Sequence, residues 1–484
     1  MISRNKNNVG KTKVIVTLVL VFEVVGILSA VHAVMSVRTP QESIAWAVSL
    51  VSLPYISVPA YWVFGRNKFQ DYVLARQHEL EQLAEVVSEA RINMKDVELA
   101  EDKDTGLLTS AEKMARIPMT HGNKVDLLID GQATFDSIFE GISSATDYVL
   151  IQFYIVRDDE LGLELKRHLI TKAQSGVRVL FLYDEVGSLG LSAAYRQELR
   201  DAGVEIFPFH SRRGSGNRFQ LNFRNHRKTV IVDGRVAWIG GHNVGDEYMG
   251  RDASFGHWRD THMRIEGPAV IGAQFAFVED WRWATDAVPG GINWNPQRVP
   301  DHDAQVLVIA SGPADPMETA SLMYTQAINA ATKRIWIASP YFVPDDSIVQ
   351  ALQLAGLRGV DVRILIPEKS DNLLVTLAAY SFFTEIKAAG VKFYRYQHGF
   401  LHQKVMLIDA DVATVGTANF DNRSFRLNFE ITSLVADTDF VLAVEQMFEA
   451  DFAESRRMER DEYDNKPYWF KLAVRSARLA APIL

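Results

Sequence analysis

Two copies of a short motif contain residue types that can attack a phosphodiester. Each copy has the pattern His-x-Lys-x4-Asp, and the copies are His226, Lys228 and Asp233, and His402, Lys404 and Asp409. A neutral imidazole is a nucleophile or a base, and an ammonium group stabilises the charge that builds up on phosphate oxygens. We therefore count both copies as catalytic motifs. Side chains alternate along a strand, so each histidine shares a face with its lysine, whereas the aspartate has the opposite parity and is expected to be a structural anchor before a turn.

Each motif is followed by a glycine-containing turn that ends in asparagine, and then by a carboxylate. Asn243 and Asn419 end these turns, where glycine lets the backbone approach closely and the amide can donate to a phosphate oxygen. Asp260 and Glu430 come further along the chain. A carboxylate on the far ring nitrogen of a histidine selects its tautomer and stabilises the imidazolium. We predict that the asparagines bind substrate and that the carboxylates support the histidines.

A pair of histidines can divide the work of a transfer reaction. One attacks phosphorus, while the other protonates the leaving alkoxide and then activates the acceptor hydroxyl. Because each motif copy supplies one histidine, two halves must pack about a pseudo-two-fold axis with His226 and His402 at the seam. The sequence has no cysteine, no His-Glu-x-x-His motif and no carboxylate cluster. We therefore expect no metal and no other cofactor, with the two lysines supplying the positive charge. A phosphate-binding loop is also missing, which disfavours nucleotide hydrolysis.

The elements that must position these residues form an internal repeat. In each copy a helical pattern leads into an apolar run, and after a second helical pattern comes another apolar run. The apolar runs are Tyr148–Tyr154 and Gly176–Leu182 in the first copy, and Ile335–Phe342 and Gly359–Ile366 in the second. Short apolar strands that alternate with helices predict an α/β fold. We expect a duplicated domain with two pseudo-symmetric mixed or parallel sheets flanked by helices, over residues 121–290 and 291–484, the second with a C-terminal tail.

The N-terminal residues 1–66 are typical of a membrane anchor. Val14–Val37 and Ile44–Phe64 are each long enough to cross a bilayer core of about 30 Å, and the short connection between them favours a transmembrane hairpin. A signal peptide is the alternative for the first stretch, but the run is long and a second one follows at once. Basic residues flank the pair on its outer ends, so the positive-inside rule places both termini and the catalytic domain in the cytoplasm. Residues 67–120 are rich in charges and helix formers, which predicts a helical linker.

Composition and two further segments bear on partners. The net charge of -9 argues against a general nucleic-acid binder. Ser211–Arg224 is a basic loop that either is solvated or contacts anionic lipid headgroups. Tyr468–Lys471 is either an interfacial segment or part of the core.

The chain as a whole resembles the bacterial cardiolipin synthases of the phospholipase D superfamily. That superfamily has paired His-x-Lys-x4-Asp motifs, and the most specific run here extends from Gly416 through Asn419 to Glu430. The resemblance implies transfer of a phosphatidyl group from one phosphatidylglycerol to another, giving cardiolipin and glycerol through a phosphohistidine, without a metal. It further implies that His226 is the nucleophile and His402 the acid and base, in the bacterial inner membrane. Thr417 and Asn422 depart from the usual pattern, which bears on acceptor preference.

Other functions are compatible with the same residues. A hydrolytic phospholipase D would use water in place of the lipid hydroxyl, and another phosphatidyltransferase would use phosphatidylethanolamine or a different alcohol. A nuclease of the superfamily fits less well, because the chain is acidic and has a membrane anchor. A scaffold without activity is disfavoured because both motifs are intact. A homo-oligomer is compatible with the sequence.

Overall fold

The computed structural model describes residues 2–37, 40–65, 72, 92–98, 106–209, 222–459 and 461–484. The chain divides into two compact units, one made of Met1–Asp71 with Ser211–Phe223, the other of Tyr72–His210 with Arg224–Leu484. We call the second one the catalytic unit. Most of the expected linker over 67–120 and of the basic loop Ser211–Arg224 lies outside the described residues.

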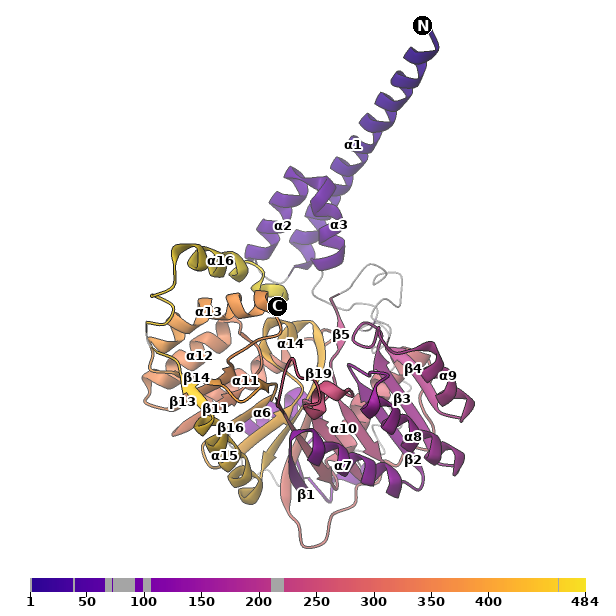
Figure 1. Ribbon diagram of the computed structural model, residues 1–484, viewed down its shortest axis with the longest axis vertical. Coiled ribbons are helices and arrows are strands. Elements are labelled where there is room, and N and C mark those ends of the chain that lie inside the picture. The colour runs from indigo at the N-terminus through magenta and orange to yellow at the C-terminus, as the bar shows by residue number, and fades with distance from the viewer. Residues whose placement is uncertain are drawn as a thin grey trace. The chain divides into compact units, whose positions relative to one another are not determined.

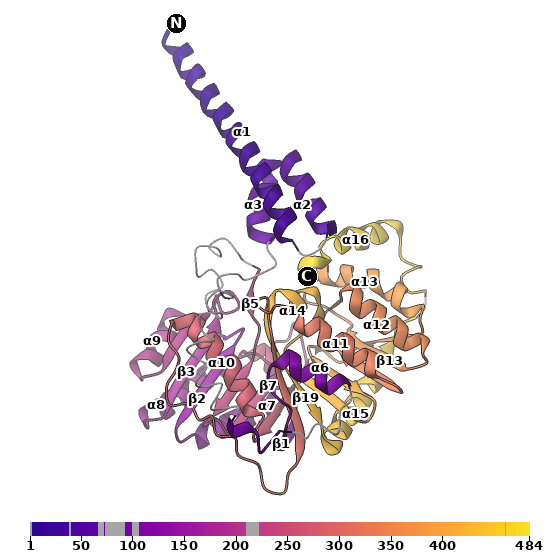
Figure 2. The same cartoon turned by 180° about the vertical axis from the view of Figure 1, so that it is seen from behind.

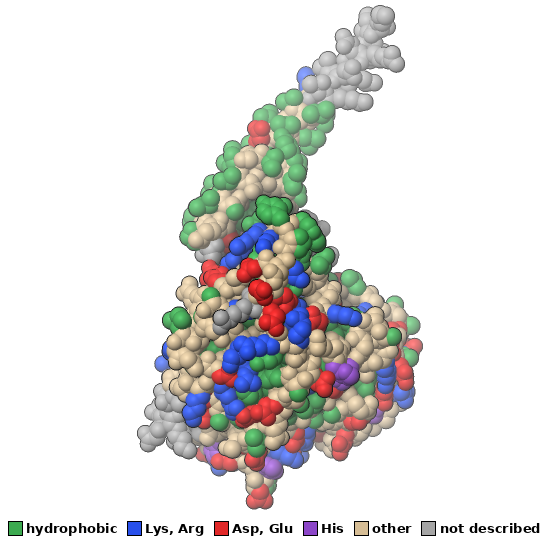
Figure 3. All heavy atoms as spheres, turned by 60° about the vertical axis from the view of Figure 1, so that its left-hand side comes forward, with side chains coloured by type: hydrophobic (Ala, Val, Ile, Leu, Met, Phe, Trp, Pro, Cys, Tyr) green, Lys and Arg blue, Asp and Glu red, His purple; other side chains and the backbone are tan. Residues whose placement is uncertain are grey.

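The N-terminal unit contains the helices α1 (Ile2–Ser36), α2 (Pro40–Ser52) and α3 (Pro54–Phe64). Within the described residues, Lys13–Ser36 of α1 is the one helical stretch long and apolar enough to cross a membrane, with a mean hydropathy of 2.7. Figure 3 shows the hydrophobic side chains that cover it. His32 lies in this stretch, and its Nδ1 is 2.6 Å from the Tyr61 hydroxyl of α3.

The second apolar stretch differs from the expectation of one continuous span over Ile44–Phe64. It is divided into α2 and α3 at Leu53, whose φ of -136° and ψ of 57° are not helical. Proline has no N–H for the helical ladder, and its ring disfavours helical geometry in the residue before it. Pro54 therefore ends α2 and begins α3.

The catalytic unit is a mixed α/β fold whose first half alternates strands and helices. Its elements are α6 (Gly106–Ala115), β1 (Thr120–Ile129), α7 (Asp130–Ser144), β2 (Tyr148–Phe153), α8 (Glu160–Gln174), β3 (Arg178–Asp184), α9 (Ala193–Asp201), β4 (Glu205–Phe209), β5 (Arg224–Asn225), β6 (Thr229–Val232), β7 (Val236–Gly240), a 3-10 turn (Asp246–Met249), β8 (Trp258–Arg259), β9 (Thr261–Glu266) and α10 (Val270–Thr285).

The second half repeats the plan. Its elements are β10 (Ala304–Ser311), α11 (Thr319–Ala330), β11 (Arg334–Ala338), β12 (Phe342–Val343), α12 (Asp346–Leu357), β13 (Asp361–Pro367), α13 (Leu373–Lys387), β14 (Lys392–Tyr396), β15 (Phe400–Leu401), β16 (Val405–Ile408), β17 (Val412–Gly416), β18 (Phe420–Asp421), α14 (Asn422–Arg426), β19 (Asn428–Ala436), α15 (Thr438–Ala453), β20 (Ser455–Arg457), α16 (Tyr468–Arg478) and a 3-10 turn (Ala481–Ile483).

Corresponding strands of the two halves pair in the same way. The strands β2, β3 and β4 are parallel, and so are β11, β13 and β14. The motif strands β6 and β16 run antiparallel to β2 and β11. The central strands are mainly apolar because both faces are covered, and the buried Gln152 of β2 donates to Asp280 Oδ2 at 2.7 Å. In β2, Val149 and Ile151 pack toward α7 and α8, whereas Leu150 packs in the cluster that contains α10 residues. Figure 1 shows α8 and α9 beside β2–β4, and Figure 2 shows α10 from behind.

The expectation of two separate sheets needs a correction, because the halves share one continuous sheet. Its order is β20-β14-β13-β11-β16-β17-β19-β10-β1-β9-β7-β6-β2-β3-β4. The junction is β10, which pairs with β1 of the first half and with β19 of the second. A single apolar core cluster also contains Met263 of the first half together with Val415 and Ile431 of the second. Backbone hydrogen bonds and shared core therefore hold the halves in a defined relation.

Candidate active site

Two short strand pairs bring the halves together just before each motif histidine. The strand β5 pairs with β19, so that Arg224 lies opposite Asn428, and β15 pairs with β8, so that Leu401 lies opposite Arg259. The pairing continues into the histidines, because the N–H of His226 donates to the Phe429 carbonyl at 2.9 Å and that of His402 to the Arg259 carbonyl at 2.8 Å. Each histidine thus lies beside the residue that precedes a carboxylate of the opposite half.

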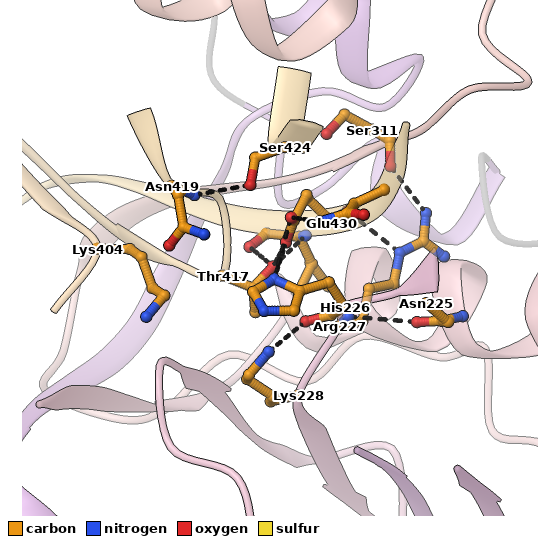
Figure 4. Close-up of polar contacts among 12 residues, drawn as sticks. Asn225, His226, Arg227, Lys228, Ser311, Lys404, Thr417, Asn419, Ser424 and Glu430 are labelled. Atoms are coloured by element: carbon orange, nitrogen blue, oxygen red, sulfur yellow. Dashed lines mark hydrogen bonds and ion pairs between the residues drawn. The ribbon is translucent and has the colours of Figure 1, made fainter. Parts of the chain in front are cut away.

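The carboxylates contact the histidines across the halves. His226 Nδ1 lies 2.9 Å from Glu430 Oε2 and 3.0 Å from Oε1. His402 Nδ1 lies 2.7 Å from Asp260 Oδ2. The prediction that Asp260 and Glu430 support the histidines left open which carboxylate serves which ring. In the structure each carboxylate contacts the histidine of the opposite half, and we call this the crossed arrangement. Figure 4 shows His226 with Glu430 and with Thr417, whose hydroxyl donates to Glu430 Oε2 at 2.5 Å.

Positively charged neighbours favour the ionised form of both carboxylates, although both are fully buried. Burial opposes ionisation of Asp260, but the positive charge of Lys404 and the nearby His402 hold its pKa below the usual value. Burial likewise opposes ionisation of Glu430, and His226 with Lys228 lowers its pKa. An ionised carboxylate only accepts hydrogen bonds, so the proton of each imidazole is on Nδ1 and the lone pair is on Nε2.

The environment keeps the imidazoles neutral. Burial lowers the pKa of His226 to about 4, with Lys228 acting in the same direction and Glu430 against it. Burial, helped by Lys404, lowers the pKa of His402 to about 3, although Asp260 opposes this. A neutral imidazole with its lone pair on Nε2 can attack phosphorus or accept a proton at neutral pH.

The motif lysines are buried beside the histidines. Lys228 Nζ donates to the His226 carbonyl at 2.6 Å, and Lys404 Nζ donates to the His402 carbonyl and lies 3.1 Å from His402 Nε2. Burial lowers the pKa of Lys404 to about 8 and lowers that of Lys228 well below the usual value. Buried ammonium groups without enough negative charge around them favour binding of an anion, and a phosphodiester supplies that charge.

Both histidines and both asparagines line one cavity of about 370 Å³. The Oδ1 of Asn243 accepts from the Ile155 N–H at 3.0 Å, and its amide side chain also hydrogen-bonds Tyr248, which lines the same cavity. Asn419 is 5% exposed, and its Oδ1 has no hydrogen-bond partner among the described residues. A buried amide of this kind is expected to bind a polar group of a ligand.

Sequence reasoning missed three further residues at this cavity. Tyr154, directly after β2, and Tyr341, directly before β12, line it. Asn428 also lines it, and its Nδ2 donates to Glu430 Oε1 at 3.1 Å. Thr417 is outside the cavity lining, and its departure from the family pattern does not indicate its contact with Glu430. One signal was available, namely the period-two spacing of Asn428 and Glu430.

The motif aspartates hold the starts of neighbouring strands. Asp233 accepts from the N–H groups of Thr146, Asp147 and Tyr148 at 2.8, 2.8 and 2.9 Å. Asp409 accepts in the same way from the N–H groups of the three residues Thr332, Lys333 and Arg334 at 2.9, 2.8 and 2.8 Å. In both places a threonine hydroxyl adds a contact of 2.8 Å. The carboxylates therefore tie the ends of β6 and β16 to the starts of β2 and β11.

We expect Asp409→Ala to destabilise the catalytic unit by about 2–4 kcal/mol, because it leaves the N–H groups at the start of β11 without their acceptor. Urea unfolding of the detergent-solubilised chain, followed by circular dichroism, measures this. The matched control is Asp411→Ala, at an exposed position of the same turn. An unchanged unfolding midpoint together with a loss of activity would instead place Asp409 in the chemistry.

Comparison with known proteins identifies similar sequences over nearly the whole chain. A family model described as cardiolipin synthase, PLD-like domain, matches residues 138–257 and 324–452, and one described as phospholipase D-nuclease N-terminal matches residues 15–66. Cardiolipin synthase A of Pseudomonas putida (strain GB-1) is 49% identical over 467 residues, which cover 95% of this chain and 96% of that protein. Cardiolipin synthase A of Pseudomonas entomophila (strain L48) is 47% identical over 96% of this chain and 98% of that protein.

A solved structure shares the fold. Phosphatidylserine synthase of Haemophilus influenzae Rd KW20 superposes with a TM-score of 0.58 at 15% identity, covering 78% of this chain and all of that one. At this identity the likeness concerns the fold alone.

Proposed function

The chain belongs to the cardiolipin synthase family with phospholipase D-like domains, and on that basis we propose that it transfers a phosphatidyl group from one phosphatidylglycerol to a second, giving cardiolipin and glycerol. The observation that carries the proposal is the pair of neutral imidazoles in one cavity, each with Nδ1 on a buried carboxylate of the opposite half. Such a site can perform a covalent transfer in two steps once the bound substrate anion has favoured uptake of one proton by the second imidazole.

In the first step, Nε2 of His226 attacks phosphorus and the bond to the glycerol oxygen breaks. The leaving alkoxide takes a proton from His402, so glycerol departs and a phosphatidyl group remains on His226. The bound phosphodiester anion favours this protonated form of His402, because a negative charge raises the pKa of an imidazole. Lys228, Lys404 and the amides of the asparagines stabilise the charge on the non-bridging oxygens.

In the second step, the now neutral His402 takes the proton of a hydroxyl on the second phosphatidylglycerol. The hydroxyl oxygen attacks phosphorus, the bond to His226 breaks, and cardiolipin leaves. Each histidine returns to its starting state. The two halves offer nearly equal geometry, so the geometry itself does not select the nucleophile. The family resemblance supports His226 in this role.

Identification of the lipid and alcohol products tests this function. The purified full-length chain in mixed micelles of phosphatidylglycerol, with EDTA present, is expected to form cardiolipin and glycerol in equal amounts, measured by mass spectrometry. Phosphatidic acid as the main product would make the protein a hydrolase. An adduct with an added alcohol or with phosphatidylethanolamine, formed in preference to cardiolipin, would change the acceptor.

The membrane arrangement is part of the proposal. We propose that α1 crosses the membrane, that α2 and α3 return as the second arm of a hairpin, and that the catalytic unit is cytoplasmic. The supporting observation is the placement of basic residues outside the two apolar stretches.

The chain lacks cysteine, so single cysteines at Gln41 and at the exposed Lys369 report on topology. A membrane-impermeant maleimide is expected to label Lys369→Cys only in inverted vesicles and Gln41→Cys only in right-side-out vesicles. Labelling of both from one side would contradict the hairpin.

We expect kcat/KM to fall by roughly tenfold per pH unit above about pH 8. Burial lowers the pKa of Lys404 to about 8, and an amine loses its charge above its pKa, so the phosphate oxygens lose a cation as the pH rises. Lys404→Arg retains a cation at high pH and should shift this alkaline limb upward by at least about one unit. An alkaline limb in the same place for both proteins would exclude Lys404 as its cause.

A further inference from the structure

The helix α16 exposes an apolar face although its other face is already packed. Its inner face contacts α13, since the Phe470 and Tyr380 rings lie 5.2 Å apart and the Arg478 guanidinium lies over Phe382 at 5.0 Å. Val474 and Ala477 on the same side are buried. The helix therefore needs no further apolar contact for its own folding.

The outer face carries four large side chains. Tyr468, Trp469, Leu472 and Leu479 are 80%, 68%, 56% and 84% exposed. At about 100° per residue these positions fall within one third of the helix circumference. Isolated exposed leucines are ordinary in proteins, but a stripe that combines Trp, Tyr and Leu on one helix face is typical of a binding surface. We call these residues, with Ile483, the apolar stripe.

The apolar stripe continues to the catalytic cavity. Ile483 follows α16 closely in the chain, is 39% exposed and lines the cavity that holds His226 and His402. On the rim of the same cavity, Asn372 and Val375 are lining residues, and the exposed Leu373 and Leu374 lie between them in the chain. Exposed apolar side chains therefore occur both on the outside of α16 and at the rim of the site.

Basic residues accompany the stripe. Lys471 and Arg475 lie on α16, and Lys466 lies just before it, in a chain whose net charge is -9. In Figure 3 hydrophobic side chains gather over α16, with Lys and Arg side chains next to them and Asp and Glu side chains beyond these. Aromatic and aliphatic side chains with a basic flank are the composition of helices that lie in the plane of an anionic membrane surface.

We propose that the apolar stripe docks the catalytic unit onto an anionic lipid bilayer, with α16 lying in the interface and the cavity mouth beside it. The occupant is the bilayer itself, because Trp and Tyr favour the headgroup level, Leu favours the acyl boundary and the basic flank complements anionic headgroups. The docking of α16 goes beyond the proposed function. Lipid entry from the bilayer into the cavity rests on that function.

The lack of cysteine allows a direct test on the full chain. Leu472→Cys, labelled with an environment-sensitive fluorophore, is reconstituted into phosphatidylglycerol-containing liposomes with nitroxide-labelled lipids. The matched control is Leu163→Cys on α8, which is also a partly exposed leucine, at 41%, and lies at a distant part of the catalytic unit (Figure 1). We expect at least about threefold stronger quenching at position 472, increasing with the phosphatidylglycerol fraction. Equal quenching at both positions would overturn the proposal. The proposal would also fail if, in detergent, the fluorophore at position 472 became shielded from solvent as the protein concentration rose, because a second copy of the chain would then cover the stripe.

Activity supplies an independent readout. Trp469→Ser combined with Leu472→Ser is expected to lower the rate on liposomal phosphatidylglycerol by about tenfold and to leave the rate on a monomeric, short-chain phosphatidylglycerol unchanged, because only the first substrate requires docking. Equal loss on both substrates, or no loss on either, would overturn the docking role. If the product were not cardiolipin, the proposed function would fail while the quenching result would still stand.

Discussion

Replacing His226 by alanine is expected to lower kcat for transfer by at least about 10⁴-fold, and His402→Ala should have a comparable effect. The physical reason is that His226 forms the covalent bond and His402 moves the proton in both steps, so neither loss is compensated by the other ring. Cardiolipin formation measured by mass spectrometry gives the rates. His302→Ala, at an exposed histidine, is the matched control and should retain wild-type activity.

An activated substrate separates the two histidines. A phosphatidyl ester of p-nitrophenol has a leaving group that needs no proton, so His402→Ala should still release p-nitrophenolate in a burst of one equivalent. The phosphatidyl group should then remain on His226, since no base activates the acceptor, and mass spectrometry of the peptide locates it. His226→Ala should show no burst. A burst in His226→Ala, with the lipid on His402, would reverse the assignment of the nucleophile.

Glu430→Gln and Asp260→Asn are expected to lower kcat by about 10²–10⁴-fold. Each carboxylate accepts the Nδ1 proton of a histidine, at 2.9 Å for Glu430 and 2.7 Å for Asp260. An amide at these places can donate to Nδ1, which moves the ring proton to Nε2 and removes the lone pair that acts on the substrate. It also removes the negative charge that stabilises the imidazolium.

The crossed arrangement makes this second prediction specific. Glu430 belongs to the second half but contacts the first-half His226, so Glu430→Gln should suppress the p-nitrophenolate burst. Asp260 contacts His402, so Asp260→Asn should retain the burst and slow only the later turnover. Glu160→Gln, at an exposed position of α8, is the control for a carboxylate-to-amide change. The opposite pattern would mean that each carboxylate supports the histidine of its own half, or that His402 is the nucleophile.

Sequence reasoning succeeded best where the information is local. The apolar runs at Tyr148–Tyr154 and Ile335–Phe342 contain β2 and β11, because a strand that is buried on both faces is mainly apolar. The parity of Asp233 and Asp409 relative to their histidines predicted strand anchors, and these carboxylates accept from N–H groups at the starts of β2 and β11. Neighbouring residues along one chain segment decide such features.

Expectations failed or stayed open where distant segments meet. The apolar composition of Ile44–Phe64 predicts one helix. In the structure Pro54 divides this stretch into α2 and α3, an effect that composition does not include. Two sheets were expected because the repeat contains two sets of strands. The pairing of β10 with both β1 and β19, which joins them, depends on edges that only become adjacent when the halves dock.

The sequence by itself determined the chemical groups of this protein and their spacing within each half, because residue type and the period of a strand are local properties. The pairing of Glu430 with His226 and of Asp260 with His402 was decided by the tertiary structure alone. That pairing rests on β5 with β19 and on β15 with β8, contacts between residues about 140 to 200 positions apart. No pattern along the chain specifies such contacts, since they arise only when the two halves bury their apolar faces against each other and align their strand edges.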